Sequence, residues 1–446
     1  MEKIDIQDVV NQEKISKLQW IIFALCFFVI LSDGIDTGIV GFIAPSLVDA
    51  WGVTKNDLRP VMSVALIGMS IGAISSGILA DKFGRKWVII GATILFGAFT
   101  IISGMATNAA ELTTFRFITG LGLGAAMPNA ATLVSEYMPT RRRALMVNML
   151  FCAFPLGITL GGLLAAGLLS IAGWEIILII SGTIPVVIAI LAVFLLKESL
   201  HILGNKGKIL ELSNIFEQIL GYKIDAKLIS NYIKPEESIE TAQPVKMVIQ
   251  KYFVPSFMMW ICCFISLFVF YVLTSWMPTL LKESGFTAEQ YSLISAIFPF
   301  GGVIGTLVIG WLMDKLKPNK VLAISYFVSA IFFAITGILS ENIYLLGLFI
   351  FLAGAGLVGS QSSLPSLAAI FYPAECRGVG VSWMHGIGRF GAIFGAFFGA
   401  YIFTFNLTIN SIFILLAIPI MISAASLLIK DRYPKAREIK RELSSV

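Results

Sequence analysis

Apolar segments long enough to cross a lipid bilayer recur from one end of the chain to the other. The hydrocarbon core of a bilayer, about 30 Å thick, needs roughly 20 apolar residues in a helix. Such segments fall near residues 18–45, 58–80, 87–106, 111–138, 143–170, 173–196, 253–281, 288–313, 320–340, 342–371, 378–404 and 407–429. Only 13% of all residues are charged, whereas about a quarter are charged in soluble chains. The sequence therefore predicts an all-α integral membrane protein with twelve transmembrane helices.

The basic residues predict how these helices are oriented. The first apolar segment keeps acidic residues in its interior and has no small-residue cleavage site, so we expect a retained helix with the N-terminus in the cytoplasm. If every segment crosses, 27 of the 32 Lys and Arg residues lie in cytoplasmic stretches, as the positive-inside bias requires. Lys55, Arg59 and Lys282 then lie in outer loops, and Arg116 and Arg389 lie within the membrane. Both termini are expected in the cytoplasm.

Two short motifs recur at nearly the same spacing along the chain. Gly77-Ile-Leu-Ala-Asp81-Lys82 returns 233 residues later as Gly310-Trp-Leu-Met-Asp314-Lys315, and Pro139-x-x-x-Arg143 returns 234 residues later as Pro373-x-x-x-Arg377. Parallel six-helix repeats with a substrate site between them at the bilayer midplane characterise one class of secondary transporters. The sequence therefore predicts two pseudo-symmetric six-helix halves.

The one long polar stretch of the chain gives the boundaries of these halves. It lies near 198–250, between the sixth and seventh apolar segments. We expect a first half over 1–197, a cytoplasmic connector over 198–250, a second half over 251–430 and a cytoplasmic tail over 431–446. Within the connector, 209–222 and 225–233 are candidates for short surface helices.

The loop Gly77–Lys86 is predicted to act as a gate. We expect Gly77 to let the second helix approach a neighbour and Gly84 to permit a tight turn. Asp81 is expected against the positive N-terminus of the eleventh helix, a contact worth about 0.3–1 kcal/mol at a surface. With Arg85 and Lys86, it would latch the cytoplasmic side shut in one state; the alternative is a plain basic loop. In the second copy Lys317 stands at the glycine position, so Asp314 is the weaker candidate for a latch.

Asp33-Gly34-Ile35-Asp36 places two carboxylates three residues apart in the first helix, and hence on one face of it. Counting from Leu18, Asp33 lies about 22 Å into the helix. An ionised aspartate inside a bilayer costs at least about 2.5 kcal/mol, so it is by default a candidate for function. Burial and a like-charged neighbour both favour the protonated carboxyl, which a proton-coupling group needs. The alternative is that both aspartates are solvated in the outer loop.

Two arginines are expected at membrane depth. Arg116 lies about 8 Å into the fourth helix, at a depth similar to that of the aspartates, and we expect it to pair with Asp36 or Asp33. Arg389, in Gly388-Arg389-Phe390-Gly391, lies near the middle of the eleventh helix, and its guanidinium suits a carboxylate ligand. Both arginines are predicted to bind an anionic substrate. A purely structural ion pair is the alternative for each.

Several further side chains are assigned to the site or to a gate. Glu136, near the cytoplasmic end of the fourth helix, is a gate candidate expected to pair with Arg141 or Arg143. His385, one turn before Arg389, is a candidate for substrate binding or proton relay, with a packed polar group as the alternative. Contacts with the substrate are also assigned to Gln361, Tyr271, Trp276 and Trp383. Helix packing and lipid contact are the alternatives for these four.

No cofactor, metal or nucleic acid is expected. The five cysteines are an odd number and four lie in apolar helices, so they indicate no disulfide framework and no metal site. Two histidines make a histidine-based metal site improbable. The sequence shows no nucleophile, base and oxyanion set at consistent spacing, so the protein is not predicted to be an enzyme. The net charge of +5 is accounted for by the basic residues of the cytoplasmic loops, so it does not require a nucleic-acid partner.

The motifs together resemble a known family. The Gly77–Lys86 loop resembles the signature loop of the major facilitator superfamily. The helix-one motif Asp33–Asp36 with Gly41-Phe-Ile-Ala-Pro45, and the later runs, resemble its aromatic acid:proton symporter family over nearly the whole chain. These runs are Arg116-Phe-x-x-Gly120-Leu-Gly-Leu-Gly-Ala-Ala-Met-Pro128-Asn129, Ser135-Glu136-Tyr137-Met138-Pro139 with Arg141–Arg143, and Gly388-Arg389.

The resemblance implies proton-coupled uptake of an aromatic carboxylate, such as benzoate, a hydroxybenzoate or protocatechuate, by alternating access across the bacterial inner membrane. It implies that Asp33 and Asp36 serve transport and that Arg116, Glu136 and Arg389 are functional. The expected partners are the aromatic acid, protons and the bilayer, with the chain acting as a monomer. Two alternatives stay open: symport of another organic anion, such as an aliphatic carboxylate, and a non-transporting sensor of aromatic acids.

Overall fold

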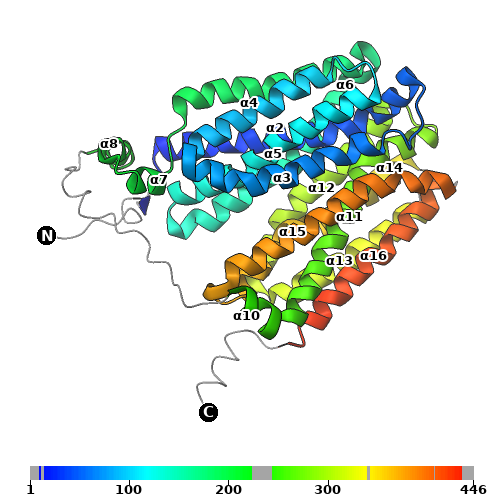
Figure 1. Ribbon diagram of the computed structural model, residues 1–446. Helices are drawn as coiled ribbons and strands as arrows, with labels where there is room; N and C mark the ends of the chain where they lie inside the picture. The colour runs from blue at the N-terminus through cyan, green and yellow to red at the C-terminus, as the bar shows by residue number, and fades with distance from the viewer. Residues whose placement is uncertain (1–9, 12–14, 223–243, 339–341, 406, 434–446) are drawn as a thin grey trace. The chain divides into compact units, whose positions relative to one another are not determined.

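The computed structural model describes residues 10–11, 15–222, 244–338, 342–405 and 407–433 (Figure 1). Eleven helices in these ranges are long and apolar enough to cross a membrane. They are α2 (Lys17–Trp51), α3 (Arg59–Phe83), α4 (Arg85–Ser103), α5 (Ala109–Tyr137), α6 (Thr140–Leu195), α11 (Phe253–Glu283), α12 (Ala288–Lys315), α13 (Pro318–Ile338), α14 (Ile343–Phe371), α15 (Ala374–Phe398) and α16 (Ile409–Lys430). A 3₁₀ helix, η1 (Gly399–Phe405), continues α15. The predicted all-α membrane fold is confirmed.

The longest helix, α6, accounts for the twelfth crossing. Its 56 residues would extend about 84 Å as one straight helix, far more than one bilayer needs. Gly173 interrupts it with a φ of 79°, a conformation that glycine adopts readily because it has no Cβ. The two parts, on either side of Gly173, match the fifth and sixth segments expected from the sequence.

The helix order repeats along the chain. Adding 233 or 234 to the bounds of α3, α4 and α5 gives the bounds of α12, α13 and α14 to within two residues, except that α12 starts four residues earlier. Backbone contacts repeat as well. Gly68 and Gly72 on α3 lie against carbonyl oxygens of α5, and 233 residues later Gly301 and Gly305 on α12 lie against carbonyl oxygens of α14. Small residues of this kind let membrane helices approach closely, so the duplicated motifs mark duplicated packing.

The chain divides into two compact units. Of the described residues, those within 1–37, 67–157 and 175–238 form unit 1, and those within 38–66, 158–174 and 239–446 form unit 2. Unit 2 therefore contains α11–α16 together with three segments from the first half of the sequence: the end of α2, the start of α3 and the middle of α6. The predicted boundary between halves, near 198–250, follows the chain but not these packing units.

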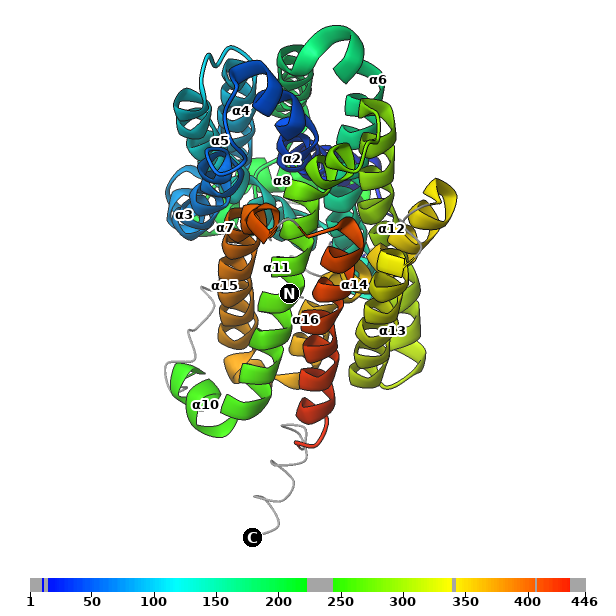
Figure 2. The same ribbon diagram turned by 90° about the vertical axis from the view of Figure 1, so that its right-hand side faces the viewer.

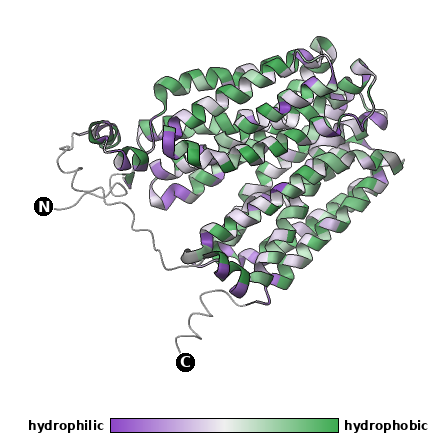
Figure 3. Cartoon of the chain, viewed as in Figure 1, coloured by the Kyte–Doolittle hydropathy of each residue, from purple (hydrophilic) through white to green (hydrophobic). Residues whose placement is uncertain are grey.

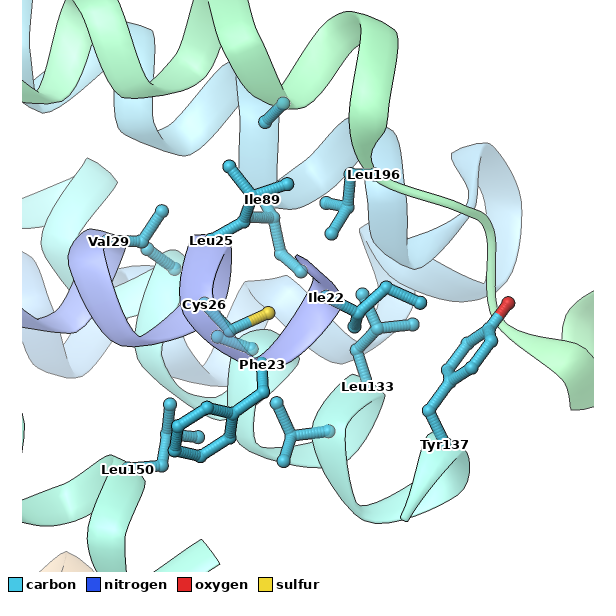
Figure 4. Close-up of a cluster of buried hydrophobic side chains, with 14 of the residues drawn as sticks. Ile22, Phe23, Leu25, Cys26, Val29, Ile89, Leu133, Tyr137, Leu150 and Leu196 are labelled. Carbon is cyan, nitrogen blue, oxygen red and sulfur yellow. The ribbon is translucent and has the colours of Figure 1, made fainter. Parts of the chain in front are cut away.

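Unit 1 has an apolar core built from α2, α4, α5 and α6 (Figure 4). Ile22, Cys26 and Ile89 are almost fully buried in it, and Tyr137 and Leu196 close its edge (Figure 4). Two short helices of the predicted connector, α7 (Leu200–Asn205) and α8 (Ile209–Leu220), add Leu203, Phe216 and other apolar side chains to this core. The helix expected near 209–222 is confirmed, and the one expected over 225–233 lies outside the described residues.

Unit 2 is built on pairs of helices. Figure 2 shows α11 beside α15 and α16, and α13 beside α16, and these pairs are in contact. The pairs α12–α14 and α13–α14 complete the bundle, and α10 (Pro244–Lys251) lies against α15. Along the long helices, hydrophilic residues concentrate at the ends (Figure 3).

Candidate functional site

A buried carboxylate–guanidinium pair lies inside unit 1. Arg116 donates from Nη1 to Oδ1 of Asp36 at 2.9 Å and from Nη2 to Oδ2 at 2.7 Å. Thr100, on α4, donates its hydroxyl to the same Oδ1. Asp36 is 0% exposed and Arg116 1% exposed. The predicted pairing of Arg116 with Asp36 is confirmed, and both carboxylate oxygens are taken by charge-assisted hydrogen bonds.

Thr100 was missed from the sequence, because a threonine inside a helix usually bonds to its own backbone. Its hydroxyl also lies 2.8 Å from the carbonyl oxygen of Phe96, four residues earlier. This is the local pattern that threonine adopts in helices. Only the approach of α4 to α2, which carries Asp36, brings the hydroxyl to the carboxylate.

Asp33 lies one turn before Asp36 on α2 and is also 0% exposed. Its Oδ1 accepts a hydrogen bond of 3.3 Å from Thr37. The alternative of solvated aspartates in an outer loop is wrong, since both lie well inside a helix that continues to Trp51. Gly34, between them, is where α2 meets α6: a Cβ there would collide with the carbonyl of Phe154.

The turn between α3 and α4 holds a second polar cluster of unit 1. Gly84 has a φ of 103°, so the predicted tight turn is confirmed. The carboxylate of Glu198 occupies the space beside Gly84 and accepts a hydrogen bond of 3.1 Å from the backbone N–H of Lys86. Arg85 forms an ion pair with Glu136, which also accepts a hydrogen bond of 2.6 Å from Ser199.

The structure adds a partner to one expectation for this cluster and corrects another. Glu136 was expected to pair with Arg141 or Arg143, and Arg85 forms an ion pair with it. The sequence favoured Arg141 and Arg143 because they are near in the chain, whereas the α3–α4 turn brings Arg85 from much further away. Gly77 was expected to allow a close helix approach, but a Cβ built there meets no described atom within 4 Å. Asp81 and Asp314 are both exposed.

The two glycines of this loop give a matched test of the structure. Gly84→Ala is expected to destabilise the protein, because a residue with a Cβ in this glycine-favouring conformation costs about 1–3 kcal/mol and its methyl group would displace Glu198. Gly77→Ala is expected to leave stability near that of the wild type. The measurement is the thermal unfolding midpoint of the purified variants in detergent. Equal midpoints for the two variants would contradict the described turn.

The candidate residues of the second half all lie in unit 2. Arg389 is partly exposed on α15, with His385 exposed one turn before it. Trp383, also on α15, is 37% exposed, and its ring lies 5.8 Å from that of Trp260 on α11. Tyr271 is buried on α11. These residues stay candidates for substrate contact.

Trp276 packs inside unit 2. It is 0% exposed, its indole N–H donates to the carbonyl of Ala396 at 2.7 Å, and its ring lies against Gly399. The assignment of Trp276 to substrate binding stays a prediction, and these packing contacts favour the alternative role. From the sequence, a tryptophan in an apolar helix looks the same in either role.

Gln361, on α14, points toward α11. Its Nε2 lies 3.6 Å from Sγ of Cys263, and Cys263 in turn lies against Gly388 of α15. Three helices thus meet at this sulfur, and Arg389 follows Gly388 in the chain. Over the described ranges, no group of three or more His, Cys, Asp and Glu side chains is arranged to hold a metal ion.

A cluster of charged and aromatic side chains, the outer cluster, joins segments 38–66 to α11 and η1 within unit 2. Lys282 of α11 forms an ion pair with Asp49 and donates to the carbonyl of Pro45 at 3.2 Å. Lys55 forms an ion pair with Glu283, and partial burial lowers the pKa of Lys55. These contacts were missed, since the sequence placed Lys55, Arg59 and Lys282 in outer loops without partners.

Cation–π contacts complete the outer cluster. The guanidinium of Arg59 lies 3.7 Å from the ring centroid of Tyr401, and Nζ of Lys55 lies 4.4 Å from that of Phe403. Both rings belong to η1. Cations at such distances from an aromatic face are attracted to it. The outer cluster thus combines two ion pairs with two cation–π contacts.

Comparison with known proteins agrees with this architecture. The family model for the Major Facilitator Superfamily matches residues 26–289 and 259–444. The 4-hydroxybenzoate transporter PcaK of Acinetobacter baylyi is 42% identical over 433 residues, covering 96% of this chain and 94% of that protein. The gallate transporter of Pseudomonas putida is 37% identical over 428 residues, covering 95% and 94%. These relatives are transporters and not enzymes.

A solved structure shows the same fold at low identity. The D-xylose–proton symporter superposes with a TM-score of 0.68 at 16% identity, covering 92% of this chain and 97% of that one. The family match, the near-complete coverage of the relatives and the duplicated helix order agree. The chain therefore belongs to the major facilitator superfamily and, within it, to the family of aromatic acid transporters.

Proposed function

We propose that the protein imports an aromatic carboxylate together with protons across the bacterial inner membrane, with both termini in the cytoplasm. The observation that carries the proposal is the group of Asp33, Asp36 and Arg116, buried side by side in a helix bundle. Intramembrane ionisable residues mark substrate and proton pathways by default. The relatives named as 4-hydroxybenzoate and gallate transporters support the substrate class.

The two aspartates are proposed to differ in role. Both oxygens of Asp36 accept hydrogen bonds from Arg116, so a proton on Asp36 has to displace that arginine. Asp33, one turn earlier on α2, is equally buried and accepts a hydrogen bond from Thr37. Because a proton on Asp36 would cost the ion pair with Arg116, we assign proton coupling to Asp33 and the fixing of Arg116 to Asp36. Thr100 positions the Asp36 carboxylate for this pair.

Arg389 is proposed as the ligand of the substrate carboxylate. It is partly exposed near the middle of α15, and its guanidinium offers five donors in a planar fork that matches a carboxylate. Arg116 is the second candidate, in a state in which Asp36 releases it. Trp383 and Tyr271 offer ring surfaces for an aromatic substrate.

The outer cluster is proposed as a latch in alternating access. It ties segments of the first sequence half to α11 and η1, on the side predicted to face away from the cytoplasm. Entry of substrate from that side requires these contacts to break. The Arg85–Glu136 pair at the α3–α4 turn is the proposed gate element at the opposite side.

Counterflow in proteoliposomes tests the proposal. Vesicles loaded with unlabelled 4-hydroxybenzoate are expected to accumulate labelled 4-hydroxybenzoate transiently, and vesicles loaded with succinate are not. Exchange of succinate alone would favour the aliphatic carboxylate alternative. Binding of 4-hydroxybenzoate without exchange would favour the sensor alternative. Empty vesicles that lack the protein serve as the control.

A further inference from the structure

The side-chain amide of Gln361 differs in its hydrogen bonding from two other buried amides. The oxygen and nitrogen of Gln19 both make hydrogen bonds, of 2.7 and 2.6 Å. The same is true of Asn319, at 3.0 and 2.7 Å. The nitrogen of Gln361 has only the sulfur of Cys263 at 3.6 Å, and its buried Oε1 accepts no hydrogen bond within the described part of the chain.

A buried acceptor without a donor needs a physical reason. Nine-tenths or more of buried polar groups in proteins are hydrogen-bonded, and leaving one unbonded costs more than a single hydrogen bond returns. An apolar residue at position 361 would avoid that cost. A ligand that donates a hydrogen bond to Oε1 would remove this cost when it binds. Ligand binding therefore gives a reason for a polar residue at this position.

The position of Gln361 relates it to Arg389. Both Gln361 of α14 and Gly388 of α15 lie against the sulfur of Cys263 on α11. Arg389 follows Gly388, so the amide and the guanidinium come from helices that meet α11 at the same level. Trp260, about one turn before Cys263, pairs with the exposed Trp383. A guanidinium, an aromatic surface and an unsatisfied amide therefore belong to one region of unit 2.

The chemistry of the amide indicates which ligand group it receives. A hydroxyl both donates and accepts hydrogen bonds, so it satisfies either end of an amide. A carboxylate only accepts, so it cannot satisfy an amide oxygen. A ligand whose carboxylate is bound by Arg389 thus leaves Gln361 free to contact a hydroxyl at another ring position.

We propose that Gln361 is the residue that recognises a ring hydroxyl of the aromatic substrate and so selects hydroxybenzoates over benzoate. This inference rests on the proposed function, since it assumes an aromatic carboxylate held by Arg389. The inference goes beyond the proposed function because it names the ring hydroxyl as the recognised group and Gln361 as the residue that binds it. Gln361 is then a specificity residue, and its Oε1, which accepts no hydrogen bond from the described residues, is the recognition group.

The test compares two acids as competitors of labelled 4-hydroxybenzoate uptake. In the wild type, unlabelled 4-hydroxybenzoate is expected to inhibit at about tenfold lower concentration than benzoate, the ratio that one hydrogen bond supplies. In Gln361→Met, which keeps the side-chain length without polar atoms, the ratio is expected to approach one. Gln361→Asn, which keeps the amide but retracts it by one carbon, is expected to lower the ratio in the same direction.

Ser329→Ala is the matched control. The Ser329 hydroxyl is buried in the same unit and donates to the carbonyl of Ala353 at 2.8 Å, so its loss removes a buried hydrogen bond away from Gln361. Its ratio is expected to equal that of the wild type. An unchanged ratio in both Gln361 variants would overturn the inference while leaving aromatic acid transport intact. A wild type that takes up no aromatic acid would instead overturn the proposed function.

Discussion

Arg116→Gln is expected to destabilise the protein strongly and to abolish transport. The variant leaves Asp36 buried without its counter-ion, and breaking one side of a buried pair costs about 3–5 kcal/mol. Asp36→Asn leaves the guanidinium of Arg116 buried without its counter-ion and is expected to have a similar effect. The double variant Asp36→Asn/Arg116→Gln removes both charges, so its unfolding midpoint is expected to recover part of the loss. Thermal unfolding in detergent and uptake in proteoliposomes measure the two effects.

The double variant separates structure from function. We expect it to regain stability but not transport, because the proposed mechanism needs a carboxylate to hold and release Arg116. A double variant that transports like the wild type would show that the pair is structural only. Single variants as stable as the wild type would show that Asp36 and Arg116 are not paired in the folded protein.

Cross-linking across the outer cluster is expected to stop transport reversibly. Cysteines placed at Asp49 and Lys282, whose side chains form an ion pair, are within reach of a short bis-methanethiosulfonate, which links them through two disulfides that a reductant opens. A covalent link there prevents the separation that substrate entry requires, so uptake is expected to fall to background after treatment and to return after reduction. Uptake of labelled 4-hydroxybenzoate before and after each step gives the result.

An ion pair within one helix provides the control for this experiment. Lys208, directly before α8, and Glu211 in its first turn form an exposed pair three residues apart, and cysteines there can be linked without joining different helices. Their cross-linking is expected to leave uptake unchanged. The five natural cysteines are buried, which limits side reactions. Full uptake with Asp49 and Lys282 linked would rule out the latch.

The sequence predicted those features that depend on spacing along single helices. The length of the apolar segments predicted the membrane crossings. The position of Arg116 along its helix predicted a depth in the membrane similar to that of Asp36. The same reasoning failed for contacts set by packing between distant elements. Thr100 reaches Asp36 only because α4 approaches α2, and the α3–α4 turn brings Arg85 to Glu136. No periodicity reveals such neighbours. The burial of Trp276 could not be predicted either, because the exposure of a single aromatic side chain depends on the whole bundle.

The two sequence halves differ at the positions of the buried pair. The positions 233 after Asp36 and 234 after Arg116 are Val269 and Ile350, both buried apolar residues. The repeated scaffold thus holds a charged pair in its first copy and apolar packing in its second. The second copy contributes Arg389 and Gln361 instead, and this asymmetry fits separate proton and substrate groups.

The most direct test of proton-coupled aromatic acid import is gradient-driven uptake by proteoliposomes. Vesicles with an acidic exterior, carrying wild type, Asp33→Asn or Arg389→Ala, are given labelled 4-hydroxybenzoate. We predict accumulation that depends on the pH gradient in the wild type. Asp33→Asn should lose this dependence, and Arg389→Ala should lose uptake. Wild-type uptake indifferent to the gradient, or gradient-driven uptake that persists in Asp33→Asn, would contradict the account.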